Sequence, residues 1–175
     1  MPQIQIVRTG DLDDPRRNAI LDLCRAAYRE DLDRYLDNIG PGVHLLGRVG
    51  GTLVSHAMFV ERWLQLHDGR LLRTAYVELV ATAPNAERRG YASALMRRLA
   101  DEIHAFDIGG LSPTGEQFYA RLGWESWRGE LLIRTGTNVV PSQDEGLMVL
   151  RLPRTPPDLS LDRPISIEWR PGEVW

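Results

Sequence analysis

Two arginines and a glycine stand at the start of a helix-forming segment, directly after an apolar, strand-forming run. The two stretches read YVELVATAPNAERRGYASALM over residues 76–96. A helix N-terminus presents unpaired N–H groups and the positive end of the helix dipole, and it therefore attracts phosphate. Gly90 would let the backbone approach a ligand closely, and Arg88 and Arg89 add positive charge beside it. This order of residues predicts a pyrophosphate cradle, with a solvated surface loop as the alternative.

The predicted cradle differs from two common phosphate-binding loops. The chain contains no G-x-x-x-x-G-K-[ST] motif, which excludes a Walker loop. A dinucleotide fingerprint needs several spaced glycines, and this stretch contains only Gly90. The chain therefore belongs to neither of these nucleotide-binding classes.

Two further side chains are candidates for acid–base chemistry. Glu78 lies inside the apolar run AYVELVA, where burial would make its carboxylate a stronger base by disfavouring the charged form. Tyr119 carries a phenol, a group with a pKa near ~10 that can donate a proton to a leaving group. A solvent-facing strand carboxylate is the alternative for Glu78, because strand side chains alternate. A packed core ring between Phe118 and Leu122 is the alternative for Tyr119.

The remaining candidates for site chemistry are weak. The four histidines, at positions 44, 56, 67 and 104, show no spacing that is typical of metal ligands, so we predict no metal site. Cys24 shares the apolar face of a predicted helix with Ile20 and Leu23, which favours a core residue over a nucleophile.

The composition is that of an ordinary globular protein with one domain, residues 1–175. Apolar residues make up 43% and charged residues 26% of the chain, and the net charge is −3. No basic block is present, which argues against nucleic acid as the main partner, and the mild acid excess fits a cationic small substrate. The single cysteine indicates a reducing compartment, and neither a signal peptide nor an apolar stretch of membrane-spanning length occurs. We therefore expect a cytoplasmic protein that does not enter membranes.

The elements that must position these residues alternate between strands and helices. Periodicity and turn residues predict strands over residues 4–9, 43–49, 52–66, 70–83, 107–112, 126–135, 146–152 and 165–170. Helices are predicted over residues 11–30, 31–39, 90–106 and 113–124. Hairpin-linked strands that precede a strand–helix–strand–helix unit predict an α+β (mixed α/β) fold with one central sheet.

The stretch Glu87-Arg88-Arg89-Gly90-Tyr91-Ala92, followed by SALM, resembles motif A of the GNAT acetyltransferase superfamily. That motif reads Arg/Gln-x-x-Gly-x-Gly/Ala, so Glu87 departs from it and puts the strength of coenzyme binding in question. GGLSPTGEQFYARLGWESW, over residues 109–127, resembles a later element of the same superfamily. YVELVAT, FYARLGW, DEG and the closing EWRPGEVW together are similar to the aminoglycoside 2′-N-acetyltransferases. The resemblance implies a mostly antiparallel, twisted central sheet flanked by helices.

This resemblance implies acetyl-CoA as the acetyl donor and assigns roles to several residues. Glu78 would act as the base through water, and Tyr119 as the acid toward the leaving thiolate. Backbone groups of Leu79, Val80 and Thr82 would pair with the pantetheine arm, and the N–H near Val80 would stabilise the oxyanion. The pyrophosphate would lie on Arg88, Arg89, Gly90, Tyr91 and Ala92.

The resemblance also implies an acidic acceptor site for a cationic amine, and it allows a homodimer. The matching positions are Asp31, Ser112, Asp144, Glu173 and Trp175 with its α-carboxylate. Solvated charges are the alternative for Asp31 and Asp144, and a hydrophobic anchor is the alternative for Trp175. Two other functions stay open: an N-acetyltransferase for a polyamine, a metabolite or a protein N-terminus, and a non-catalytic acyl-CoA-binding or drug-binding protein.

Overall fold

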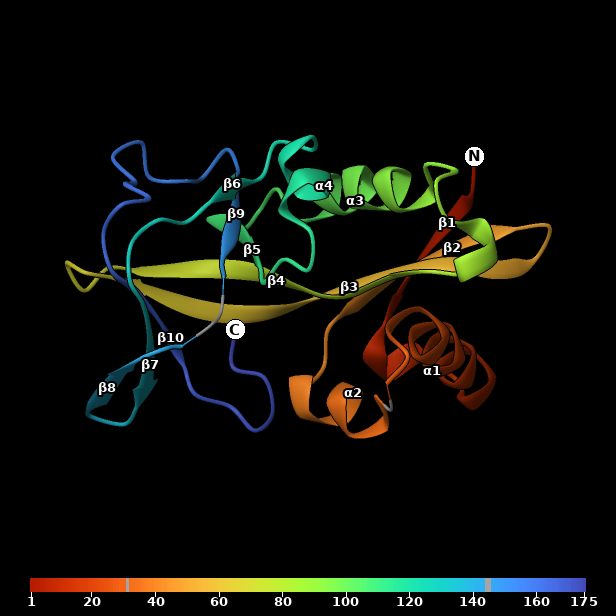
Figure 1. Ribbon diagram of the computed structural model, residues 1–175, viewed down its shortest axis with the longest axis horizontal. Helices are drawn as coiled ribbons and strands as arrows, with labels where there is room; N and C mark the ends of the chain where they lie inside the picture. The colour runs from red at the N-terminus through yellow and green to blue at the C-terminus, as the bar shows by residue number, and fades with distance from the viewer. Residues whose placement is uncertain (31, 144–145) are drawn as a thin grey trace. The chain divides into compact units, whose positions relative to one another are not determined.

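The computed structural model of the chain describes residues 1–30, 32–143 and 146–175. Figure 1 shows the arrangement of its helices and strands. The helices are α1 (Asp14–Tyr28), α2 (Asp33–Ile39), α3 (Tyr91–Glu102) and α4 (Glu116–Ala120), with short 3-10 turns at Thr9–Asp11 and Pro84–Ala86. The strands are β1 (Gln3–Arg8), β2 (Val43–Val49), β3 (Thr52–Leu66), β4 (Leu71–Thr82), β5 (Ile108–Leu111), β6 (Glu125–Ser126), β7 (Leu131–Thr135), β8 (Asn138–Pro141), β9 (Met148–Arg151) and β10 (Ile165–Glu168).

The chain forms two compact units. Unit 1 comprises Met1–Val60 and Val77–Asp101, and unit 2 comprises Glu61–Tyr76 and Glu102–Trp175. The long strands β3 and β4 are each divided between the two units, so each unit contains part of both strands. The prediction of a single domain over residues 1–175 stays a prediction.

Unit 1 is a sheet with helices on both faces. β1 pairs with β2, and β2 with β3, both antiparallel. The end of β4 lies beside β3, where the Ala83 N–H donates to the Val54 carbonyl at 2.9 Å. Figure 1 shows α3 on one face of these strands and α1 and α2 on the other. The β2–β3 ladder contains a bulge beside Gly47, where the register shifts by one residue.

Local sequence signals explain why the helices of unit 1 begin and end where they do. The Asp13 side chain caps α1 by accepting from the Arg16 N–H at 3.0 Å, and Pro15 occupies the first turn. α1 buries Cys24 among leucines and an isoleucine, and burial raises the pKa of that thiol to about 12. A neutral, buried thiol is a poor nucleophile, as the sequence pattern predicted.

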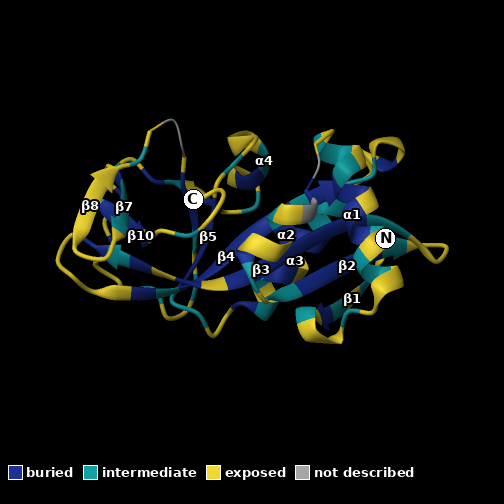
Figure 2. Cartoon of the chain, turned by 90° about the horizontal axis from the view of Figure 1, so that it is seen from below, coloured by how far each residue is buried: buried dark blue, intermediate teal, exposed yellow. Residues whose placement is uncertain are grey.

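Unit 2 has a longer sheet and one short helix. Its strands follow the order β6-β9-β5-β4-β3-β10-β7-β8. β4–β5 and β10–β7 are parallel, whereas β6–β9, β5–β9, β3–β10 and β7–β8 are antiparallel. The inner strands are buried, and β8 at the edge is exposed along its length (Figure 2). The core of this unit includes Leu64, Ile108 and Ile167.

The predicted fold class, a mixed α+β sheet flanked by helices, is confirmed, but several element boundaries differ. The predicted helix over residues 113–124 is reduced to α4, which begins only after Gly115, a residue in the extended conformation. The predicted strand over residues 126–135 is interrupted at Gly129, where the Arg163 backbone approaches so closely that a Cβ would clash. β8 was not predicted. Within the described residues, no helix is long and apolar enough to cross a membrane.

Candidate active site

Glu78 is held on β4 by a tyrosine from α2. Glu78 is only 6% exposed to solvent, so it is a buried residue. The Tyr35 hydroxyl donates to Glu78 Oε2 at 2.8 Å. A hydrogen bond from a phenol restricts the carboxylate to one orientation and satisfies part of its need for donors away from bulk water. The arrangement fits a carboxylate with a fixed position, and the predicted alternative of a solvent-facing strand side chain does not describe it.

The backbone of β4 is kinked immediately after Glu78. Leu79 has a φ of +50°, in the left-handed region that a non-glycine residue adopts at a cost of about 1–2 kcal/mol. The Leu79 carbonyl accepts from His56 Nδ1 at 2.8 Å, and the Val80 carbonyl accepts from the Tyr28 hydroxyl at 2.9 Å. Side chains from β3 and α1 therefore hold two successive carbonyls of this stretch. Thr82, another predicted site residue, closes the strand two residues later.

A chain of buried and partly buried hydrogen bonds leads from the kink to Thr9, in the short turn after β1. His56 Nε2 and His44 Nδ1 are 3.0 Å apart, and His44 Nε2 lies 3.0 Å from Thr9 Oγ1. Burial lowers the pKa of His44 to about 4, and the positive charge of Arg17 adds to this effect. Burial lowers the pKa of His56 to about 3, with a further contribution from His44. Both imidazoles are therefore neutral at pH 7.

The predicted cradle lies between β4 and α3. Arg88 and Gly90 have positive φ angles of +59° and +79°, while Arg89 between them does not. This alternation of backbone handedness turns successive N–H groups toward one side, as in anion-binding nests. A Cβ on Gly90 would meet no atom within 4 Å, so the space beside it is open, and both arginines are exposed. These residues fit a pyrophosphate group, with Tyr91 and Ala92 forming the first turn of α3.

Tyr119 lies in α4 of unit 2, with its ring packed among aromatic neighbours. Its ring centroid is 4.9 Å from that of Phe118 and 6.3 Å from that of Trp124, both edge-on. Tyr119 is 7% exposed, and burial raises the pKa of its phenol to about 12. The phenol therefore keeps its proton at physiological pH. This packing is what the predicted core alternative requires, and it is also compatible with proton donation.

The predicted acceptor residues that the structure describes also belong to unit 2. Ser112 follows β5 and is exposed, and Glu173 is exposed with its carbonyl bound to Arg170 Nε at 2.6 Å. Trp175 is only 2% exposed, so its side chain packs as the predicted anchor would. The other two predicted residues, Asp31 and Asp144, lie outside the described residues.

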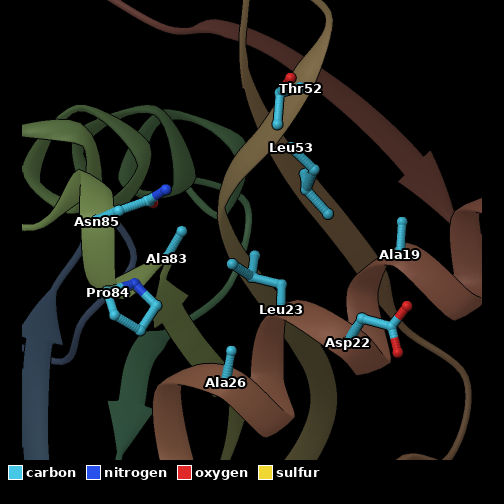
Figure 3. A pocket seen from close by; sticks show the side chains of 9 residues that line it. All are labelled: Ala19, Asp22, Leu23, Ala26, Thr52, Leu53, Ala83, Pro84 and Asn85. Atoms are coloured by element: carbon cyan, nitrogen blue, oxygen red, sulfur yellow. The ribbon is translucent and has the colours of Figure 1, made fainter.

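A pocket of about 520 Å³ opens in unit 1, and it contains none of the predicted site residues (Figure 3). It is lined by Ala19, Asp22, Leu23, Ala26, Thr52, Leu53, Ala83, Pro84 and Asn85. Its one carboxylate, on Asp22, is paired with Arg25 at 2.9 Å. Glu78, Leu79 and the cradle residues 88–92 are not among the lining residues, whereas Ala83, Pro84 and Asn85 join Thr82 to the cradle.

Sequence reasoning missed four side chains that hold the site, namely those of Tyr28, Tyr35, His44 and His56. The spacing of the histidines was compared only with that of metal ligands. Among the described residues, no group of three or more His, Cys, Asp or Glu could hold a metal ion. The signal that could have found them is their position on the two strands that flank the Gly50-Gly51 turn. For the tyrosines, only their position on the two helices near the N-terminus offered a hint.

A mixed sheet flanked by helices, a kinked strand and an open cradle at the start of the following helix define an acetyltransferase of the GNAT type. The model of the acetyltransferase (GNAT) domain family matches residues 16–127, well over half of the chain. The chain therefore belongs to the GNAT acetyltransferase family.

Solved structures with little sequence identity share this fold. A GNAT family N-acetyltransferase (YhbS) from Escherichia coli, in complex with CoA, is similar with a TM-score of 0.64 and 14% identity, over 95% of this chain and 91% of that one. The ribosomal-protein-S18-alanine N-acetyltransferase from Escherichia coli is similar with a TM-score of 0.60 and 17% identity, over 90% and 99%. Eis1 from Mycobacterium abscessus has a TM-score of 0.60 and 19% identity over 74% of this chain, which spans only 32% of the Eis1 chain.

Proposed function

We propose that the protein transfers an acetyl group from acetyl-CoA to an amine, with Glu78 as the base that removes the amine proton. The observation that carries this proposal is the buried Glu78 carboxylate, hydrogen-bonded by Tyr35 on a strand that kinks at the next residue. Buried carboxylates with a fixed orientation are typical of acid–base sites.

The amine requires such a base, because an alkylammonium with a pKa near ~10 is almost fully protonated at pH 7. Glu78 would accept this proton through one or more water molecules. Tyr35 would keep the carboxylate turned toward that water throughout the reaction, since its hydroxyl binds Oε2. The negative charge of Glu78 would also favour the approach of a cationic acceptor.

The acetyl donor finds a matching set of groups on unit 1. When bound, acetyl-CoA supplies an acetyl group that is activated as a thioester. Backbone groups of Leu79, Val80 and Thr82 would hold its pantetheine arm. The pyrophosphate would lie in the cradle at Gly90, where the backbone turns inward and the space is open. The Val80 N–H would donate to the carbonyl oxygen as negative charge develops there.

Tyr119 is proposed as the donor to the departing thiolate. A pKa of about 12 keeps its phenol protonated, so the proton is present whenever it is needed. The same high pKa reduces the driving force for donation. We therefore expect Tyr119 to contribute less to the rate than Glu78.

The acceptor proposed is the 2′-amine of an aminoglycoside. Support comes from the similarity of YVELVAT and EWRPGEVW to the aminoglycoside 2′-N-acetyltransferases, and from the acidic residues at 31, 144 and 173. Carboxylates bind ammonium groups by charge-assisted hydrogen bonds, so such a site suits a polycation. A polyamine, a metabolite or a protein N-terminus would use the same Glu78 and cradle without those acidic residues.

Thiol release from acetyl-CoA with two matched acceptors tests this proposal. Kanamycin B carries an amine at the 2′ position and kanamycin A carries a hydroxyl there. Release with kanamycin B alone would support 2′-acetylation, and equal release with both would move the target to another amine. Binding of acetyl-CoA without thiol release in the presence of any amine would contradict acetyltransferase activity and favour a non-catalytic binding protein.

A pair of glutamine variants tests the role of Glu78. Glu78→Gln should lower kcat more than about tenfold, because it removes the base and preserves the shape of the side chain. Glu61→Gln, which changes an exposed glutamate on β3, is the matched control and should leave kcat unchanged. A normal kcat and pH–rate profile in Glu78→Gln would show that another group is the base.

A further inference from the structure

The two buried histidines of unit 1 lie in a hydrogen-bond chain whose proton positions are fixed by its inner end, at Leu79. At the inner end, the Leu79 carbonyl can only accept, so His56 Nδ1, at 2.8 Å, must carry the proton. A neutral imidazole has one N–H, which leaves His56 Nε2 as an acceptor for the N–H at His44 Nδ1, 3.0 Å away. Both histidines are therefore Nδ1–H tautomers.

The outer end of the chain agrees with this assignment. His44 Nε2 is left as an acceptor, and Thr9 Oγ1 lies 3.0 Å from it with a hydroxyl proton that the Gly42 carbonyl, at 3.1 Å, can also accept. Thr9 Oγ1 in turn accepts from the Gly42 N–H at 2.8 Å. The N–H groups of His44 and His56 thus point the same way, toward Leu79. Aligned hydrogen bonds polarise one another, which strengthens the last bond in the series, at Leu79.

The bond to Leu79 controls the direction of the next amide. The C=O of Leu79 and the N–H of Val80 belong to one planar trans peptide, and they point in opposite directions. Because the His56 imidazole binds the carbonyl, the Val80 N–H must point away from that imidazole. The parallel register of β4 with β5 covers only Thr74–Tyr76 and has ended before this point. Val80 thus lies beyond the part of β4 that pairs with β5 in this register.

We propose that His56, backed by His44, is a positioning residue that fixes the Leu79–Val80 peptide and so aims the Val80 N–H at the acetyl carbonyl. The proposal rests on the acetyl-transfer function proposed above. Neither histidine touches the reacting atoms. Their role is to hold Leu79 in a left-handed backbone conformation, which costs a leucine more free energy than it would cost a glycine. This residue lies in the strand segment that also carries Glu78.

Two amide variants of His56 separate positioning from general support of the fold. The Nδ2 of asparagine stands where His56 Nδ1 stands, so His56→Asn keeps a donor for the Leu79 carbonyl. The amide of glutamine reaches the position of Nε2, so His56→Gln keeps polarity and places the donor away from Leu79. His56→Gln should lower kcat about 100-fold with little change in the KM for acetyl-CoA, because a misaimed donor raises the barrier without removing the binding site.

The expected result is that His56→Asn retains kcat within about threefold of the wild type, while His56→Gln loses it. Urea unfolding of both variants provides the control for stability. Equal losses of kcat in the two variants, in proportion to their losses of stability, would overturn the proposal. So would a ¹⁵N NMR spectrum that shows His56 as the Nε2–H tautomer in the wild-type protein.

The amide resonance of Val80 distinguishes failure of this proposal from failure of the proposed function. If the wild-type protein acetylates no amine, the function is wrong, and the positioning role is still tested in the same samples. A Val80 N–H resonance that is preserved in His56→Asn and displaced in His56→Gln would support the role of His56. Equal displacement in both variants would overturn it.

Discussion

β3 carries a buried hydrogen-bond donor in each of its halves, and the two donors bind different parts of the chain. In unit 1, the neutral imidazole of His56 binds the Leu79 carbonyl, beside the proposed base. In unit 2, the guanidinium of Arg62, which is 9% exposed, binds the Glu168 and Val174 carbonyls near the end of the chain. In both units a side-chain donor on β3 binds a backbone carbonyl. In unit 1 this bond stabilises β4 at Leu79, and in unit 2 the bonds hold the segment that contains Glu168 and Val174.

The chemistry of the donors fits these two tasks. A guanidinium keeps its charge at any pH at which the protein folds, and its planar fork can bind two acceptors at once. A neutral imidazole donates through one N–H and accepts at its other ring nitrogen, so His56 also binds His44. Unit 2 thus has an attachment that acid cannot release. In unit 1, protonation of His56 at Nε2 would remove the acceptor of the His44 N–H and leave the bond from Nδ1 to the Leu79 carbonyl in place. The following predictions test this contrast, from the largest expected effect to the smallest.

Trp175→Ala should have the largest effect, since it removes the indole that the fastened segment buries in unit 2. Truncation of a fully buried large side chain lowers the free energy of unfolding by about 3–5 kcal/mol. Trp169→Ala is the matched control, because this indole is 53% exposed. Urea unfolding would measure both. Equal losses would show that burial of Trp175 does not hold the segment in place.

Arg62→Ala should lower the free energy of unfolding by about 3 kcal/mol, because two carbonyls lose a charged donor. Arg62→Lys should recover only part of this loss, since an ammonium lacks the planar fork. Urea midpoints of the two variants at pH 7 provide the measurement. Full recovery by lysine would mean that charge alone, without the two-point geometry, fastens the segment.

Acid should weaken unit 1 before it weakens the ion pairs of unit 2. The pKa values of His44 and His56 lie below their ordinary value of 6.5 in the folded protein, so the unfolded chain binds more protons. Stability should therefore fall as the pH drops from about 6.5 toward 4, by up to about 1.4 kcal/mol per pH unit for each histidine. The unfolding free energy measured by urea at several pH values tests this, and a flat profile between pH 6.5 and 4 would contradict it.

The carboxylates of unit 2 provide the reference for that titration. Hydrogen bonds from arginines lower the pKa of Asp158 and Asp162 below the ordinary value of 3.8. The contribution of these ion pairs to the free energy of unfolding is present above pH 3.8 and is lost only as the pH falls below that value. The two windows are therefore separate, and an acid titration distinguishes the histidines from the exposed pairs.

Thr9→Val should have the smallest effect, at the outer end of the hydrogen-bond chain. It removes the hydroxyl that lies beside His44 Nε2 and the Gly42 carbonyl and that accepts from the Gly42 N–H, which lowers stability by about 1 kcal/mol. Thr9→Ser keeps the hydroxyl and should be close to the wild type. Thermal unfolding resolves this difference, and a valine variant as stable as the serine variant would exclude Thr9 from the chain of bonds.

Much of the fold and of the cradle was within reach of the sequence. Alternation of apolar residues predicted most strands, and Gly90 with its arginines marked the beginning of α3. Glu78 and Tyr119 were selected for their chemistry and for their resemblance to known positions, and their catalytic roles stay predictions. These features depend on neighbours along the chain, which the sequence shows directly.

The features that were missed depend on contacts between distant segments. Nothing in the residues around Leu79 requires a left-handed backbone, because His56 and Tyr28 impose it from β3 and α1. β8 was missed for a similar reason. Its four residues are all exposed, so the burial pattern that reveals other strands is absent from it.

The bulge beside Gly47 carries a further consequence, for the comparison of related sequences. Without it, a regular hairpin closed by Val49 and Thr52 would place His56 opposite Leu45, on the other face of the sheet from His44. With one extra residue absorbed at the bulge, His56 lies opposite Leu46, and both histidines share a face. When relatives with a β2–β3 hairpin one residue shorter are aligned, the gap belongs at the bulge and not at the Gly50-Gly51 turn. An alignment that closes the gap at the turn would pair the wrong columns and hide the coupling between the two histidine positions.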